Sequence, residues 1–145
     1  LMGALCLETC DLQLVETLKV STQTTIDLLA RLERANPYRR LIHVILDRAP
    51  VHRGQAVRDW LARPGCRVRL HFLPAYAPNL NAIERLWKVM HQHVTHNRYY
   101  SNFRTFAEAI MRFLKTTLPR KWDSIRDTVN DNFDIVRPEK FRFIG

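Results

Sequence analysis

The fold is decided by one stretch of this sequence, Leu41-Ile42-His43-Val44-Ile45-Leu46-Asp47. The residues before the acid are almost all apolar and rich in β-branched side chains, and the run has the length of a strand rather than of a helix. A strand of this kind has both faces covered, as in the middle of a parallel sheet. The stretch therefore predicts a central, parallel strand over residues 41–47 in a protein of the α/β class.

The segments on either side of this strand predict further strands and helices in alternation. Apolar residues at helical spacing begin after Ser21 or Thr22, either of which can cap a helix, and Pro119 closes the last long helix. Residues 122–131 predict a short helix, and the tail at 133–145 looks irregular. We expect strands at about 2–8, 12–18, 41–47 and 67–73, and helices at about 22–35, 54–63, 81–97 and 103–118.

The strand at 67–73 alternates strictly between apolar and polar residues. Every second residue from Val68 to Phe72 faces one side, while Arg67, Arg69 and His71 face the other. This alternation is typical of a half-exposed strand near a sheet edge. Together the elements predict an α/β sandwich in which helices cover a mixed sheet.

Composition restricts the possible classes of function. The 145 residues include 23 basic and 14 acidic side chains, a net charge of +9, which favours a polyanionic partner. No apolar run is long enough to cross a membrane, and the first residues lack the basic region of a signal peptide. Three cysteines without a C-x-x-C spacing predict reduced thiols in a cytosolic protein.

Two carboxylates stand out by their positions. Asp47 ends the 41–47 strand, and open α/β sheets place their sites at such carboxyl ends. Glu84 lies in the first turn of the helix at 81–97, on the flank of its apolar stripe. Carboxylates brought together in this way bind Mg²⁺ or Mn²⁺. Two such ions, about 3.5–4 Å apart, can activate water or a 3′-hydroxyl for attack on a phosphodiester, without a nucleotide cofactor.

Structural explanations of the same acids stay open at this point. Asn81 can cap the helix with Glu84 as its capping-box partner, and Glu84 can also pair with Lys88 one turn later. Asp47 can equally be a turn or capping residue. The histidines of His91-x-His93-x-x-His96 have no pair at i,i+4, so zinc is not predicted there.

Two motifs surround these acids. The first is Asp47-Arg48-Ala49-Pro50-Val51-His52, and the second is Leu73-Pro74-Ala75-Tyr76-Ala77-Pro78-Asn79-Leu80-Asn81-Ala82-Ile83-Glu84-Arg85-Leu86-Trp87. They resemble the Asp-Asn-x-Pro-x-His and Leu-Pro-x-Tyr-Ser-Pro-x-Leu-Asn-Pro-Ile-Glu-x-x-Trp motifs of the Tc1/mariner superfamily of transposases, in particular its bacterial insertion-sequence branch. Asp47 and Glu84 have 36 residues between them, close to the spacing of that family's second and third catalytic acids.

The resemblance implies an RNase H-like fold and metal-dependent DNA cleavage and strand transfer at transposon ends. Asp47 and Glu84 would be two of three catalytic, metal-binding acids of a DDE superfamily endonuclease. Residues expected to contact DNA or to support the site are Arg48, His52, Arg53, Asn81, Arg85, Lys88 and His91. His52 has the alternative of an ordinary first-turn helix residue. The implied protein is bacterial, cytoplasmic and nucleoid-associated, with DNA as its partner and a homodimer as one possible assembly.

The sequence departs from the family pattern in three places. We expect the first strand of the fold, with the first catalytic Asp, to be missing from this chain; that strand normally lies mid-sheet, between the strands matched by 2–8 and 41–47. Arg48 replaces an Asn, and Ala82 replaces a Pro. The chain alone is therefore expected to show little or no strand transfer. The alternative function is a non-catalytic remnant that binds nucleic acid or inhibits an intact transposase.

Overall fold

A computed structural model describes residues 1–9, 11–75 and 77–129 of the chain. The chain divides into two compact units, Leu1–Arg85 and Leu86–Gly145, where the sequence suggested one domain. The tail predicted to be irregular lies outside the described residues, as do the last two residues of the helix predicted at 122–131. Within the described residues no helix is long and apolar enough to cross a membrane.

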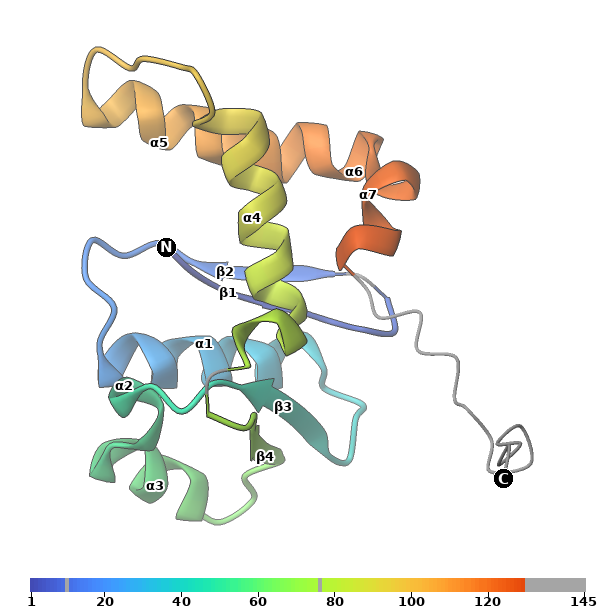
Figure 1. The fold of residues 1–145 in the computed structure, drawn as a ribbon. Coiled ribbons are helices and arrows are strands. Elements are labelled where there is room, and N and C mark those ends of the chain that lie inside the picture. The colour runs from blue at the N-terminus through green and yellow to red at the C-terminus, as the bar shows by residue number, and fades with distance from the viewer. Residues whose placement is uncertain (10, 76, 130–145) are drawn as a thin grey trace, which may run out of the picture. The chain divides into compact units, whose positions relative to one another are not determined.

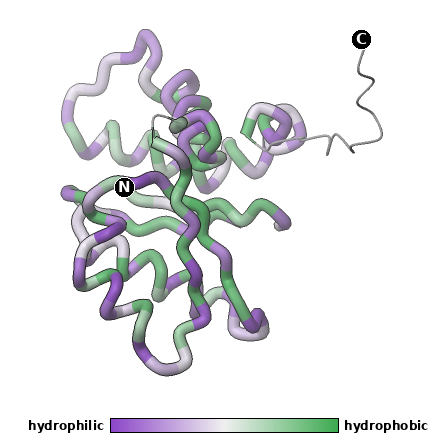
Figure 2. The backbone as a smooth tube through the Cα atoms, turned by 60° about the horizontal axis from the view of Figure 1, so that its bottom comes forward, coloured by the Kyte–Doolittle hydropathy of each residue, from purple (hydrophilic) through white to green (hydrophobic). Residues whose placement is uncertain are grey.

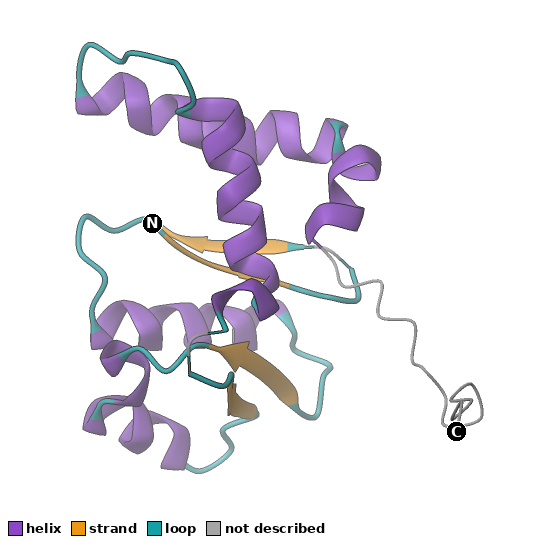
Figure 3. Cartoon of the chain, viewed as in Figure 1, coloured by secondary structure: helices purple, strands orange, loops and turns teal. Residues whose placement is uncertain are grey.

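The first unit contains two separate pairs of strands. Strands β1 (Met2–Leu5) and β2 (Leu12–Val15) pair antiparallel, with Met2 opposite Val15 and Leu5 opposite Leu12. Strands β3 (Ile42–Leu46) and β4 (Val68–Phe72) pair in parallel, with Ile42 opposite Val68. Among the described residues no hydrogen bonds join the two pairs, which appear as separate ribbons in Figure 3. The expected single mixed sheet is therefore observed as one antiparallel and one parallel pair.

Helix α1 (Thr22–Ala35) supplies most of the core of this unit. It contacts both strands of the antiparallel pair, and Figure 1 shows it alongside β3 as well. Ser21 caps it, since its hydroxyl accepts a hydrogen bond from the Thr24 amide while the Thr24 hydroxyl bonds the Ser21 amide. Leu29 packs in one buried cluster with Val57 of α3 (Gln55–Ala62) and Val68 of β4. Hydrophobic and hydrophilic colours alternate along these helices in Figure 2, as one-sided burial requires.

A carboxylate and two arginines attach the end of α1 to the start of β4. The Glu33 side chain, 13% exposed, accepts hydrogen bonds from the Arg67 amide at 2.6 Å and from the Arg63 guanidinium. Burial alone would raise the pKa of Glu33, but these donors hold that pKa below its ordinary value. The Arg67 guanidinium donates to the carbonyls of Glu33, Asn36 and Arg39 at 2.6–2.7 Å. The sequence predicted Arg67 on the exposed face of a strand. In the structure β4 begins one residue later, and the Arg67 guanidinium is hydrogen-bonded to these carbonyls.

The prediction that β3 is a central strand with two covered faces is wrong for the described residues. One face packs on α1 and α3, with Val44 against the Leu29 cluster. The other face is open, and Ile45 there is 48% exposed. His43 and His71 lie side by side on that face, with Nδ1 of the first 2.8 Å from Nε2 of the second. The apolar sequence of β3 called for a covering element on this face, and the described residues of the first unit do not supply one.

The helix predicted at 54–63 consists of α2 (Pro50–Arg53) and α3, because Gly54 lies between two short helices with extended backbone angles. The helix predicted at 81–97 is α4 (Ala82–Val94), preceded by a short 3-10 turn, Pro78–Leu80. Helix α4 begins in the first unit and continues into the second.

The second unit is helical. Helix α5 (Phe103–Arg112) continues into a π-helical turn (Phe113–Thr117), and then into α6 (Leu118–Arg120) and α7 (Trp122–Val129). Pro119 therefore does not close the helix as predicted. The wide π turn lets the chain remain helical there, since the Leu118 amide bonds the Phe113 carbonyl and Pro119, which lacks an amide hydrogen, occupies the first turn of α6.

Candidate active site

Asp47 lies immediately after β3, at the carboxyl end of the parallel strand pair. Its side chain is 50% exposed and bonds back to the chain that follows it. Oδ1 accepts a hydrogen bond from the Ala49 amide at 3.0 Å and lies 2.8 Å from Nδ1 of His52. Oδ2 has no hydrogen-bond partner within residues 1–9, 11–75 and 77–129. The turn role considered for Asp47 is thus real, but it occupies one carboxylate oxygen and leaves the other for a ligand.

His52 lies on the short helix α2, which Pro50 starts with its fixed backbone angle. Its side chain is only 12% exposed, and Nδ1 is also 3.3 Å from the Asp47 carbonyl oxygen. The imidazole is therefore held against one residue and has little freedom to move. Its position in the structure fixes the orientation of the Asp47 carboxylate.

Glu84 lies in the first turn of α4, which Asn81 caps. The Asn81 side-chain oxygen accepts a hydrogen bond from the Ile83 amide at 3.3 Å, and its carbonyl accepts one from the Glu84 amide at 3.1 Å. Among the described residues the Glu84 carboxylate makes no capping-box bond to Asn81 and no ion pair with Lys88. Asn81 is therefore the structural residue of this turn, and the exposed Glu84 carboxylate is left without a structural partner there.

The two carboxylates influence each other electrostatically. Loss of hydration on burial, and then the negative charge of Asp47, raise the pKa of Glu84 above its ordinary value. Both acids belong to the first unit. Across the described residues, no group of three or more His, Cys, Asp or Glu side chains is placed to hold a metal. The site as described is a pair of acids.

The arginines expected near the acids are used in different ways. Arg48 donates through Nε to the Leu73 carbonyl at 3.1 Å and makes no ion pair with Asp47 among the described residues. Arg85 donates to the Asn79 carbonyl at 2.7 Å. Both guanidinium groups thus donate to carbonyls of the segment between β4 and α4. Arg53 is exposed and lies on the same helix as His52.

Lys88 and His91 lie farther along α4, in the second unit. Lys88 is exposed, and Nδ1 of His91 is 3.3 Å from the Thr95 hydroxyl. His93 is turned toward the helix, with Nδ1 2.9 Å from the Val89 carbonyl and its ring stacked near Phe113. These contacts are those of structural side chains, and they give His91 and His93 local partners on their own unit.

Removal of the Glu84 charge should stabilise the metal-free protein. Because the raised pKa means that the folded state binds the proton more tightly, stability falls as the pH rises through that pKa. Glu84→Gln should therefore raise the free energy of unfolding at neutral pH, by less than about 1 kcal/mol at this solvent-exposed position. The gain should vanish in acid, where the carboxyl is protonated in both states. Urea unfolding across pH measures this, with exposed Glu16→Gln as control; equal gains in both variants would contradict it.

Comparisons with known proteins identify the family of the chain. A family model described as DDE superfamily endonuclease matches residues 1–107, a range that contains both acids. The insertion element IS630 uncharacterized 39 kDa protein of Shigella sonnei is 29% identical over 99 residues, which are 68% of this chain. The chain covers only 29% of the length of that relative. No solved structure is significantly similar to the chain.

Proposed function

The chain belongs to the DDE superfamily endonuclease family, and from this premise we propose that it forms part of a transposase catalytic domain of an insertion element. Its proposed activity is divalent-metal-dependent cleavage of DNA and transfer of the cut strand at the element's ends. The observation that carries the proposal is that Asp47 and Glu84, two acids from different elements, are near enough for the negative charge of Asp47 to help raise the pKa of Glu84. The transposase motifs surround these same two acids.

The acid pair fits Mg²⁺ or Mn²⁺ in its donor chemistry. Both ions prefer carboxylate oxygens, and a cation would relieve the repulsion that raises the pKa of Glu84. Asp47 would bind through Oδ2, while His52 and the Ala49 amide hold Oδ1. When bound, the metal supplies a lowered pKa for the attacking water or hydroxyl and neutralises charge on the phosphate. Asn81 fixes the turn of α4 from which Glu84 projects.

We further propose an RNase H-like arrangement in which a third acid comes from outside the described residues. Support comes from the two strand pairs, which no hydrogen bonds join within the described part of the chain. A strand placed between the pairs would merge them into one mixed sheet. It would also bring its side chains to the edge where Asp47 lies. Two acids alone leave most of the oxygen ligands of a metal to water and substrate.

The proposal predicts weak but specific metal binding by the 145-residue chain. Paramagnetic Mn²⁺ should broaden NMR signals of residues around Asp47 and Glu84 before all others, because relaxation enhancement falls steeply with distance. Asp47→Asn and Glu84→Gln should each abolish this selective broadening, while Asp59→Asn on α3 should keep it. Broadening that is equally strong in the two acid variants would overturn the proposed metal site. Little or no strand transfer is expected from this chain by itself.

A further inference from the structure

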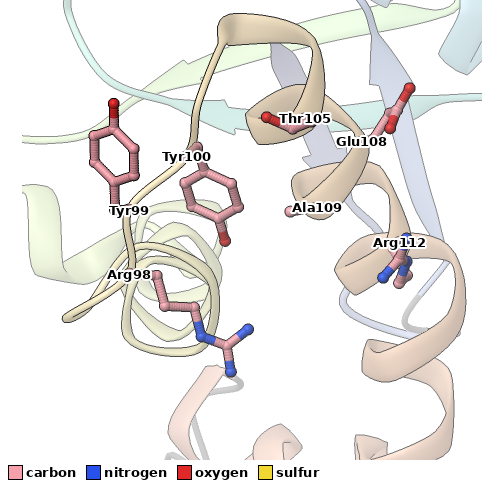
Figure 4. A pocket seen from close by; sticks show the side chains of 7 residues that line it. All are labelled: Arg98, Tyr99, Tyr100, Thr105, Glu108, Ala109 and Arg112. Atoms are coloured by element: carbon pink, nitrogen blue, oxygen red, sulfur yellow. The ribbon is translucent and has the colours of Figure 1, made fainter.

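We propose that the second unit carries a separate binding site for a DNA strand, formed by Arg98, Tyr99 and Arg112. The site is a shallow pocket of about 430 Å³ between the loop that follows α4 and one face of α5. Figure 4 shows Arg98 and Tyr100 on the loop side, and Thr105, Ala109 and Arg112 on the helix side. The inference takes DNA as the ligand from the proposed function, but it does not depend on the acid pair.

The shape of the pocket follows from the spacing of residues on α5. Thr105, Ala109 and Arg112 are four and three positions apart, so they share one face of the helix. Ala109 in the middle has only a methyl side chain, which leaves the hollow, and Arg112 extends at its end. Glu108 also lines the pocket, but its carboxylate accepts a hydrogen bond from Arg104 at 3.0 Å. The charge left over in the pocket is that of two guanidinium groups.

The loop is held in one conformation by its own contacts. Asn97 takes a left-handed backbone angle (φ 55°), which turns the chain sharply after α4. The Tyr100 hydroxyl donates to the Val94 carbonyl, and its ring packs edge-on against Phe106, with centroids 5.5 Å apart. The Asn102 side chain caps α5 through the Thr105 amide at 3.0 Å. Anchors on both sides therefore present Arg98 and Tyr99 with little loss of conformational entropy on binding.

The free groups of the pocket match the chemistry of a nucleic-acid strand. Arg98 and Arg112 are exposed, and their guanidinium groups have no hydrogen-bond or ion-pair partner in the described part of the chain. Guanidinium groups bind phosphate oxygens in bidentate fashion. Tyr99 follows Arg98 directly in the chain, and its side chain is 91% exposed. Such rings stack with unpaired bases, which gives single strands an affinity that does not depend on sequence.

These residues were absent from the sequence predictions, which concentrated on the two transposase motifs. The available signal was Arg98-Tyr99-Tyr100, a cation beside two aromatic residues. Arg112 comes close to them only through the turn between α4 and α5. Only the structure places Arg112 at the same pocket as Arg98 and Tyr99, so the sequence alone did not predict this site.

The test is fluorescence anisotropy with the 145-residue chain and labelled DNA of about 15 nucleotides, single-stranded and duplex, in EDTA. Arg98→Gln with Arg112→Gln should weaken binding to both DNAs by about 10-fold or more and reduce the single-strand salt slope by about 1.4. Tyr99→Ala should weaken only single-strand binding, by about 10-fold, and Tyr99→Phe should restore it. Arg120→Gln, which removes a charge from the same unit but does not line the pocket, is the matched control.

Failure of this inference can be told apart from failure of the proposed function. The binding assay is run in EDTA, so its outcome does not depend on whether Asp47 and Glu84 hold a metal, which the Mn²⁺ broadening tests separately. Unchanged affinity and salt slope in the double arginine variant would overturn the site. An effect of Arg120→Gln as large as that of the double arginine variant would do the same, as would displacement of DNA by polyglutamate at equal charge. Circular dichroism confirms that each variant is folded.

Discussion

Asp47→Asn and Glu84→Gln are each expected to reduce metal-dependent DNA cleavage by at least about 1000-fold in any cleavage-competent protein that contains this chain. Either change keeps the shape of the side chain but removes the negative charge that holds a divalent cation. Asp47→Asn removes the carboxylate whose Oδ2 is open to a ligand. Glu84→Gln removes the negative charge that interacts with Asp47. Nicking of supercoiled plasmid in Mg²⁺ and in Mn²⁺ measures the effect.

A graded control accompanies this expectation. His52→Asn should reduce cleavage by only about 10- to 100-fold, because His52 orients Asp47 and does not itself bind the metal. Asp59→Asn on α3 should leave cleavage unchanged. Full nicking activity in either acid variant would contradict the roles proposed for Asp47 and Glu84. A drop of the same size in Asp59→Asn would show that the assay reports folding and not chemistry.

Arg67→Ala should destabilise the protein by about 3 kcal/mol, the largest stability effect expected for one exposed or half-buried side chain here. The guanidinium donates to carbonyls at the end of α1 and in the turn before β3. Alanine would leave the Arg39 carbonyl without a donor among the described residues, and the Glu33 and Asn36 carbonyls with only their longer bonds, at 3.3 Å, from the Asn36 and Arg39 amides. The Arg67 amide would keep its bond to Glu33, so the loss isolates the side chain. Urea unfolding followed by far-UV circular dichroism measures the change.

Arg69→Ala is the matched control, because Arg69 is exposed on the open face of β4 only two residues away. It should change stability by less than about 0.5 kcal/mol. Arg67→Lys should recover only part of the loss, since one ammonium group cannot reach carbonyls on different sides as a planar guanidinium does. A stability change in Arg69→Ala as large as that in Arg67→Ala would contradict the specific role of Arg67.

Local sequence signals predicted most element positions because their causes are local. Helix α1 covers the predicted range 22–35, where Ser21 supplies the cap and apolar residues repeat at helical spacing. The strands lie within their predicted ranges but are shorter. Pro119 was misread because the π turn before it depends on hydrogen bonds that no propensity describes. The prediction that both faces of β3 are covered was wrong because the covering of a strand depends on elements far away in the chain.

The sequence by itself determined the family and the parallel strand that Asp47 follows, and it singled out the two acids proposed for the site. These features follow from residue types and their spacing, which do not depend on tertiary contacts. Only the tertiary structure decided that His52 holds one oxygen of Asp47, that Arg48 turns to Leu73, and that Arg67 binds the end of α1. It alone brought Arg98 next to Arg112. The physical reason is that a long polar side chain can reach many acceptors, and only the folded backbone determines which of them lies within hydrogen-bond distance.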